Sequence, residues 1–196
     1  MQKRVFIIHG WHGYPEEGWF PWLKKELEKN NFKVETPKMP NTDSPNIKSG
    51  TSFLSKLVKK TDESTYFVGH SIGCQTILRY LETLNPNTKI GGMILVAPWM
   101  TLNEATYKEE GEEGRKIAKL WIETPINFKK IKTMTNNIIA VFSDNDPYVP
   151  LENINIFEKE LNATIILEQK KGHFSGDDNI KELSIALKKI LTFTKK

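Results

Sequence analysis

Six short apolar runs, separated by longer amphipathic stretches, make up the pattern of this chain. Several runs are continuous stretches of Val, Ile and Phe rather than alternating ones, which is typical of parallel strands covered by helices on both faces. The predicted strands are RVFIIHG (4–10), FKVETPKMP (32–40), TYFVGHS (65–71), GGMILVAP (91–98), NIIAVFSD (137–144) and ATIILEQ (163–169).

Helical periodicity occupies several of the segments between these runs. It predicts helices over WFPWLKKELEKN (19–30), over SIGCQTILRYLETL (71–84) and near the C-terminus. The apolar positions at helical spacing are Trp19, Leu23 and Leu27, then Ile77, Leu81 and Leu84, and finally Ile180, Leu183, Leu187 and Ile190. Strands that alternate with helices in this way predict a doubly wound α/β sheet, in a single domain spanning 1–196.

Residues 101–125, TLNEATYKEEGEEGRKIAKLWIETP, form the one break in composition. The segment is charged, interrupted by glycines, and lies between two predicted strands. It is either a long crossover helix with a solvated face or a small lid over a pocket, and the pattern favours neither.

Composition narrows the class of protein. Of the 196 residues, 38% are hydrophobic and 27% charged, as in soluble globular chains. The net charge is +4, but no basic stripe interleaved with aromatics suggests a nucleic-acid partner. No run approaches the roughly 18 apolar residues of a membrane span, and the single cysteine is compatible with a reducing compartment. We therefore expect a cytoplasmic protein.

Ser71 lies in the pattern Gly69-His70-Ser71-Ile72-Gly73, where a predicted strand stops and a predicted helix starts. A nucleophile elbow requires small residues two before and two after its serine, because the turn is sharp and larger side chains would collide with nearby backbone. The alternative is an ordinary serine N-cap with glycines for tight packing. The strand–turn–helix context favours the nucleophile.

A serine nucleophile needs a base, and the base needs an acid that orients it. His173, in the late loop KGHF, comes late enough for the chain order Ser, Asp, His. His9 and His12 lie in the first strand-end loop, and His70 is expected to point away from its neighbour Ser71. A surface-loop histidine is the alternative for His173.

Two aspartates follow the fifth predicted strand, in SDNDPYVP (143–150). Asp144 is one residue past the strand, and Asp146 lies deeper in the turn. Spacing alone does not separate them. We expect one to cap the turn, a common role for Asp before Pro, and the other to meet the imidazole.

An oxyanion hole needs two donors. The elbow supplies the backbone N–H of Ile72, and the loop after the first strand supplies that of Trp11, since Gly10 and Gly13 let this loop approach the serine. No carboxylate or Cys stands in register with His9 and His12, so a metal pair is not expected there.

Several motifs together resemble the small serine hydrolases of the retinoblastoma-binding protein 9 and YdeN type, from Arg4 to the C-terminal helix. The motifs are VFIIHGWHG, GWFPWLKKELE, VGHSIG, ILVAPW, SDNDPYVP and KGHF. The resemblance implies a compact α/β-hydrolase with six parallel strands in the order 2-1-3-4-5-6. It implies Ser71 as nucleophile, His173 as base and Asp146 as acid, because the family's acid precedes two residues and then an apolar one.

Two departures from the family stand out. Trp11 and His12 replace a more glycine-rich first loop. Cys74 lies in IGCQT, which does not match the Leu-x-Cys-x-Glu motif for which the human member is named, so that partner is not carried over.

The predicted function is a metal- and cofactor-independent serine hydrolase acting on small carboxylic esters or amides. Trp11, Trp99 and Trp121 are candidate walls of the substrate pocket, with core packing as the alternative for each. Two rival functions stay open: a non-catalytic protein-interaction module on the same fold, and an acyltransferase or thioesterase. The sequence identifies no protein partner and no oligomeric state.

Overall fold

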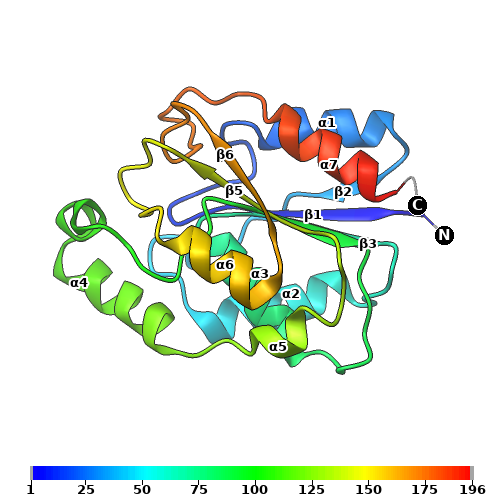
Figure 1. Cartoon of the computed structure of the whole chain (residues 1–196), viewed down its shortest axis with the longest axis horizontal. Helices are drawn as coiled ribbons and strands as arrows, with labels where there is room; N and C mark the ends of the chain where they lie inside the picture. The colour runs from blue at the N-terminus through cyan, green and yellow to red at the C-terminus, as the bar shows by residue number, and fades with distance from the viewer. Residues whose placement is uncertain (1, 195–196) are drawn as a thin grey trace.

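The computed structural model describes residues 2–194 and forms one parallel sheet with helices on both faces (Figure 1). The strand order is β2-β1-β3-β4-β5-β6, and every neighbouring pair is parallel. The strands are β1 (Arg4–Ile8), β2 (Lys33–Glu35), β3 (Thr65–His70), β4 (Gly92–Val96), β5 (Ile138–Ser143) and β6 (Thr164–Glu168). This confirms the predicted fold class and strand order.

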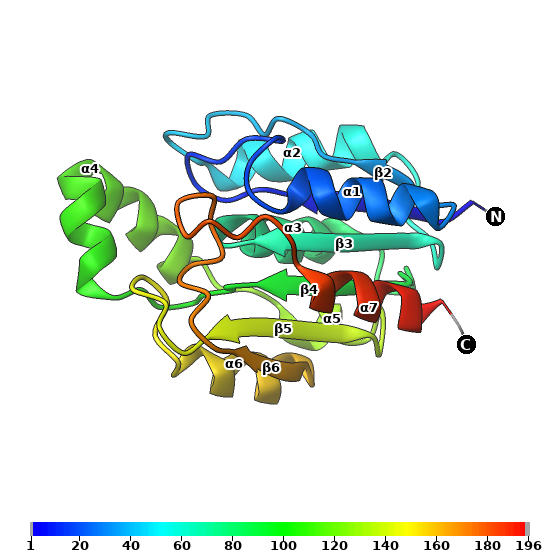
Figure 2. The ribbon, with the colours of Figure 1, turned by 90° about the horizontal axis from the view of Figure 1, so that it is seen from above.

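Helices α1 (Phe20–Lys29) and α7 (Ser184–Phe193) cover one face of the sheet (Figure 1). The opposite face carries α2 (Ile47–Val58), α3 (Ile72–Thr83), α5 (Phe128–Ile131) and α6 (Asn153–Leu161). Helix α4 (Glu104–Glu123) lies apart from both layers, beyond the carboxyl ends of the strands (Figure 2). None of the helices among residues 2–194 is long and apolar enough to cross a membrane.

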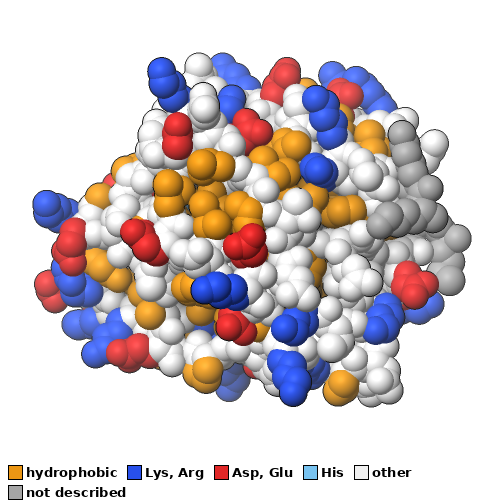
Figure 3. All heavy atoms as spheres, in the orientation of Figure 1, with side chains coloured by type: hydrophobic (Ala, Val, Ile, Leu, Met, Phe, Trp, Pro, Cys, Tyr) orange, Lys and Arg blue, Asp and Glu red, His pale blue; other side chains and the backbone are white. Residues whose placement is uncertain are grey.

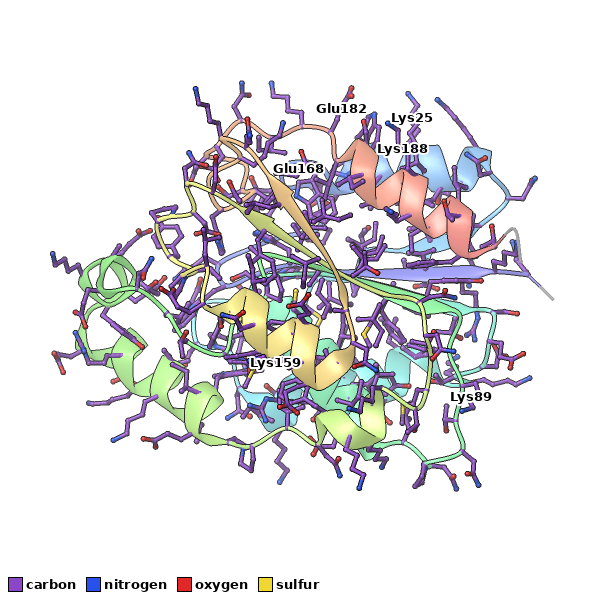
Figure 4. All side chains as sticks on the ribbon, in the orientation of Figure 1. Lys25, Lys89, Lys159, Glu168, Glu182 and Lys188 are labelled. Carbon is purple, nitrogen blue, oxygen red and sulfur yellow. The ribbon has the colours of Figure 1, made fainter. Side chains whose placement is uncertain are left out.

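The core lies between the central strands and both helical layers. Every residue of β3, β4 and β5 is buried, which is why these strands read as continuous apolar runs. The edge strand β6 is only partly covered: Leu167 is half-exposed, and hydrophobic side chains are visible over this strand in Figure 3. Charges of both signs are interspersed on the same face (Figure 3), and Lys25, Glu182 and Lys188 extend outward near α1 and α7 (Figure 4).

The bounds of two predicted helices differ in the structure: one ends earlier and the other begins later. Leu84 is the extended residue that follows α3. Ile180 and Leu183 precede α7, and Leu183 has φ −129° and ψ 72°, so the last helix begins only at Ser184. The apolar periodicity continued upstream because Leu183 is buried in the same core, although its backbone is not helical.

Helix α4 is divided by Gly111, whose φ of 65° and ψ of −164° are not helical. Its C-terminal half is anchored to α3 by Arg79, which is 3% exposed. The Arg79 guanidinium donates to the carbonyl oxygens of Trp121 (2.6 Å) and Thr124 (2.8 Å). Unpaired carbonyls at a helix end favour a cation, so this contact fixes where α4 ends.

Replacing Arg79 by Met should release the end of α4 and lower the free energy of unfolding by about 1.5–3 kcal/mol, the usual contribution of a hydrogen bond to a charged group. Arg115 is the matched control on α4 itself, because its ion pair with Glu104 is largely exposed. Arg115→Met should cost less than about 1 kcal/mol. Urea unfolding measures both; equal losses would contradict the anchoring role.

Candidate active site

Ser71 occupies the turn between β3 and α3, at the carboxyl end of a central strand. Its φ of 53° and ψ of −124° lie in a region that non-glycine residues rarely adopt. The turn is held by a hydrogen bond from Ser71 N to Val96 O of β4, at 2.9 Å. The residue is 8% exposed and lines a pocket. Ser71 therefore lies on a sharp strand-to-helix turn in a strained backbone conformation, beside a pocket.

The two glycines that flank the serine are required by close backbone contacts. A Cβ at Gly73 would meet the carbonyl oxygens of Ile8 and His9, at the end of β1. A Cβ at Gly69 would lie 2.8 Å from the backbone N and Cα of Cys74. Both positions therefore exclude any side chain, and α3 begins in direct contact with β1.

His173 follows β6 and meets Asp146, which follows β5. The Nδ1–H of His173 donates to Asp146 Oδ2 at 2.8 Å, and the Asp146 side chain is 3% exposed. Asp146 Oδ1 accepts from the amides of Tyr148 and Val149. Asp146 thus caps the turn and meets the imidazole, whereas we expected these tasks to fall to different aspartates. Asp144 is exposed, and within residues 2–194 its side chain accepts only from Lys170 N, at 2.7 Å.

Further contacts hold the His173 ring and its backbone. The ring of Tyr148 stands edge-on to that of His173, with centroids 5.2 Å apart. Tyr148 donates its hydroxyl to Glu109 Oε2 of α4 at 2.6 Å, and this hydrogen bond raises the pKa of Tyr148 to about 12. The amide of His173 donates to Asp178 Oδ2 at 2.8 Å. The histidine is therefore restrained from three sides.

The loop after β1 passes close to the serine. An added Cβ at Gly10 would lie 3.3 Å from Ser71 Cβ, so glycine permits the approach. His9 fixes the start of this loop with two hydrogen bonds: its Nε2 accepts from Met39 N and its Nδ1–H donates to Gly10 O. Within residues 2–194, neither the Trp11 amide nor the Ile72 amide has a hydrogen-bond partner.

His12 links this loop to α4 through hydrogen bonds with carboxylates, and it does not pair with His9. Its Nδ1 lies 3.0 Å from Asp43 Oδ1 and its Nε2 lies 3.0 Å from Glu110 Oε2. Burial by itself would lower the pKa of His12, but the hydrogen bonds and charges of Glu110 and Asp43 outweigh it and raise the pKa. Among the described residues, no group of three or more His, Cys, Asp or Glu side chains could hold a metal ion.

An open pocket of about 790 Å³ collects these groups. Ser71 and His173 both line it, although no hydrogen bond joins the Ser71 hydroxyl to His173 within the described residues. Trp11 and Trp99 lie in its wall, as expected. Trp121 does not line this pocket. Its indole is buried and donates to Pro45 O at 3.0 Å.

The pocket wall also contains residues that were not predicted: Tyr14, Trp22, Tyr148 and the α4 residues Thr106, Glu109 and Glu110. Tyr14 was visible as an aromatic in the first loop, and Trp22 as a tryptophan off the apolar face of its helix. Nothing local marked the α4 residues, which reach the pocket only because α4 folds over the strand ends.

A parallel sheet in this order, with a serine at the β3–α3 elbow, defines an α/β-hydrolase fold. The chain matches the model of the serine hydrolase family over residues 5–190, and it belongs to that family. It is 31% identical to YdeN of Bacillus subtilis over 186 residues, 94% of this chain and 93% of YdeN. It is 27% identical to the rat serine hydrolase RBBP9 over 176 residues, 89% of this chain and 87% of RBBP9. The crystal structure of the B. subtilis ydeN product superposes with a TM-score of 0.89 at 28% identity, covering 100% of both chains.

The His12 contacts should respond to pH. A neutral imidazole has one N–H and can donate to only one of two carboxylates, so the double contact is complete below the ordinary pKa near 6.5 and is lost as pH rises through the raised pKa. Trp11 stacks on His12, with ring centroids 6.1 Å apart, and a protonated imidazole quenches indole fluorescence. A fluorescence titration should therefore show a transition with a midpoint above 6.5.

His12→Asn should abolish this transition, and Glu110→Gln should lower its midpoint. A transition that persists unchanged in His12→Asn would show that His12 does not cause it.

Proposed function

We propose that this protein hydrolyses small carboxylic esters or amides through Ser71, His173 and Asp146. One observation carries the proposal: the His173 imidazole is hydrogen-bonded to a buried carboxylate while its ring lines the same pocket as a serine on a strained elbow. A purely structural serine would need neither the positive φ nor a histidine–carboxylate pair beside it.

In the proposed mechanism, Ser71 Oγ attacks the acyl carbon while His173 Nε2 takes the hydroxyl proton. Asp146 keeps the other ring nitrogen protonated and stabilises the imidazolium that forms. The unpartnered amides of Trp11 and Ile72 stabilise the oxyanion, and Ile72 lies at the N-terminus of α3, where the helix dipole adds to the effect. The imidazolium then protonates the leaving group. Water, activated by the same histidine, hydrolyses the acyl-enzyme.

In the proposed mechanism, the hydrogen bond between the Ser71 hydroxyl and His173 forms when substrate binds. Catalytic hydrogen bonds are often absent or long in a free enzyme and form when substrate binds. The first step uses side chains and backbone amides alone, so it requires no cofactor.

We also propose that the first half of α4, within the segment 101–125, is the lid of this pocket. Glu109 and Glu110 contact opposite walls, through Tyr148 and His12, and the non-helical Gly111 follows directly. A lid this short covers little apolar surface, which favours small substrates. The C-terminal half is held by Arg79 and stays with the body of the protein.

Ser71→Ala should abolish labelling by a fluorophosphonate probe and reduce hydrolysis of p-nitrophenyl esters by several orders of magnitude, because only the oxyanion hole and binding would remain. Circular dichroism should show the fold unchanged. Wild-type turnover in this variant would refute the mechanism. Native protein that takes neither probe nor any ester or aminoacyl amide would favour the interaction module, and acyl transfer to an added acceptor faster than hydrolysis would favour the acyltransferase.

Asp146→Asn should lower turnover by on the order of 10⁴-fold, as the corresponding change does in well-studied triads, because the histidine loses its proper tautomer. Asp144→Asn is the matched control, since Asp144 touches only a backbone amide of the adjacent loop. It should cost far less. Steady-state kinetics with one ester compare them, and the reverse ranking would overturn the assignment.

Short acyl esters should be the best substrates in a series of increasing chain length. Trp11→Ala removes a wall residue but keeps the Trp11 amide, so it should shift the preference toward longer chains. A native preference for long fatty acyl chains would show instead that α4 forms an effective acyl-binding cap.

A further inference from the structure

His70, which precedes Ser71 in the chain, contacts the backbone of His173. Its Nε2 lies 2.7 Å from the carbonyl oxygen of His173, and the two rings are 5.0 Å apart between centroids. The sequence suggested only that His70 points away from Ser71. In the structure its ring is 3% exposed and packs between the base loop and the rings of Trp19 and Phe20.

The contact has a defined direction. Burial, together with the neighbouring charge of His173, lowers the pKa of His70 to about 3, so the ring is neutral near neutral pH. A carbonyl oxygen can only accept, so the single N–H of neutral His70 is on Nε2 and donates to His173 O. His70 Nδ1, the unprotonated nitrogen, is buried without a hydrogen-bond partner among the described residues.

We propose that His70 is a positioning residue that sets the place of His173 relative to Ser71. The proposal rests on the hydrolase mechanism above. Ser71 and His173 lie on separate loops, 102 positions apart, and His70 is covalently joined to one and hydrogen-bonded to the other. One hydrogen bond therefore links the nucleophile's turn directly to the base.

The hydrogen bonds of His173 to Asp178 and Asp146 do not hold its carbonyl group. Asp178 holds its amide and Asp146 holds Nδ1 of its ring. The carbonyl of His173 is held by His70, and the Trp19 indole holds the next carbonyl, that of Phe174, at 3.0 Å. With amide, carbonyl and Nδ1 all restrained, the position of Nε2 in the pocket follows.

A neutral donor suits this position better than a cation. In the proposed reaction His173 becomes an imidazolium, and a permanent positive charge 5.0 Å from its ring would oppose that step. His70 supplies an N–H without a charge across the pH range of the reaction.

The test compares His70→Gln with His70→Phe, and uses Trp19→Phe as the matched control. Glutamine keeps an N–H donor near the place of Nε2, whereas phenylalanine fills the space without one. Trp19→Phe removes a buried donor to the neighbouring carbonyl, so it reproduces the loss of stability without touching residue 173.

In His70→Phe, kcat should fall by on the order of 10²-fold with KM little changed, the effect of misplacing a reacting group by about 1 Å. The pH profile of kcat/KM should also change, because a displaced ring loses its contact with Asp146. His70→Gln should restore most of kcat and the native pH profile. Trp19→Phe should lower the melting temperature without moving the profile.

Imidazole ¹⁵N NMR provides a readout that does not depend on activity. Native His70 should show the Nε2–H tautomer and no titration through the neutral range, and the His173 signals should change in His70→Phe but not in Trp19→Phe. An Nδ1–H tautomer in the native protein would overturn the proposal even if no variant folds. Equal losses in His70→Gln and His70→Phe, or a shifted pH profile in Trp19→Phe, would also overturn it. Absence of Ser71-dependent hydrolysis would instead refute the proposed function, and the NMR spectra would still decide the contact.

Discussion

The candidate site depends on the contact between the start of α3 and the end of β1. Gly73 packs against the carbonyl oxygens of Ile8 and His9, and no side chain fits between them. This contact brings the helix N-terminus to the carboxyl edge of the sheet and forces Ser71 into its positive φ. It also brings the amide of Ile72 and the loop that begins at Gly10 to the same point. In an open α/β sheet this edge is where ligands bind, and the elbow lies at its centre.

The loops around this point are tied to one another by buried or half-buried hydrogen bonds. The loop after β6 is held by groups from β3, from the loop after β5 and from the start of α1, through His70, Asp146 and Trp19. Each of these hydrogen bonds comes from a different element, so the loop after β6 has little freedom to move independently of the sheet. A rigid frame of this kind keeps reacting groups aligned before substrate arrives.

The two halves of helix α4 are held by contacts of different strength. Its C-terminal half is fixed by the buried Arg79, whereas its N-terminal half meets the pocket through polar contacts of Glu109 and Glu110 with Tyr148 and His12. Exposed polar contacts are weak, and the one at His12 depends on protonation. The same helix therefore combines a buried anchor at one end with exposed polar contacts at the other, and the backbone change at Gly111 separates them.

Local signals in the sequence determined the six strands, three of the helices, the elbow and the late histidine, because burial on both faces and the turn after β3 are encoded within a few residues. Helix α2 escaped notice although Asn46 caps it and Leu54 and Val58 share its buried face. Residue spacing left Asp144 and Asp146 open, and the family resemblance favoured Asp146; the tertiary structure brings Asp146 to His173. Only the tertiary structure turned His70 toward the loop after β6 and placed Trp121 away from the pocket. These contacts join residues 27 to 103 positions apart, and side-chain direction across such separations depends on how the loops pack at the end of the sheet, which no local pattern contains.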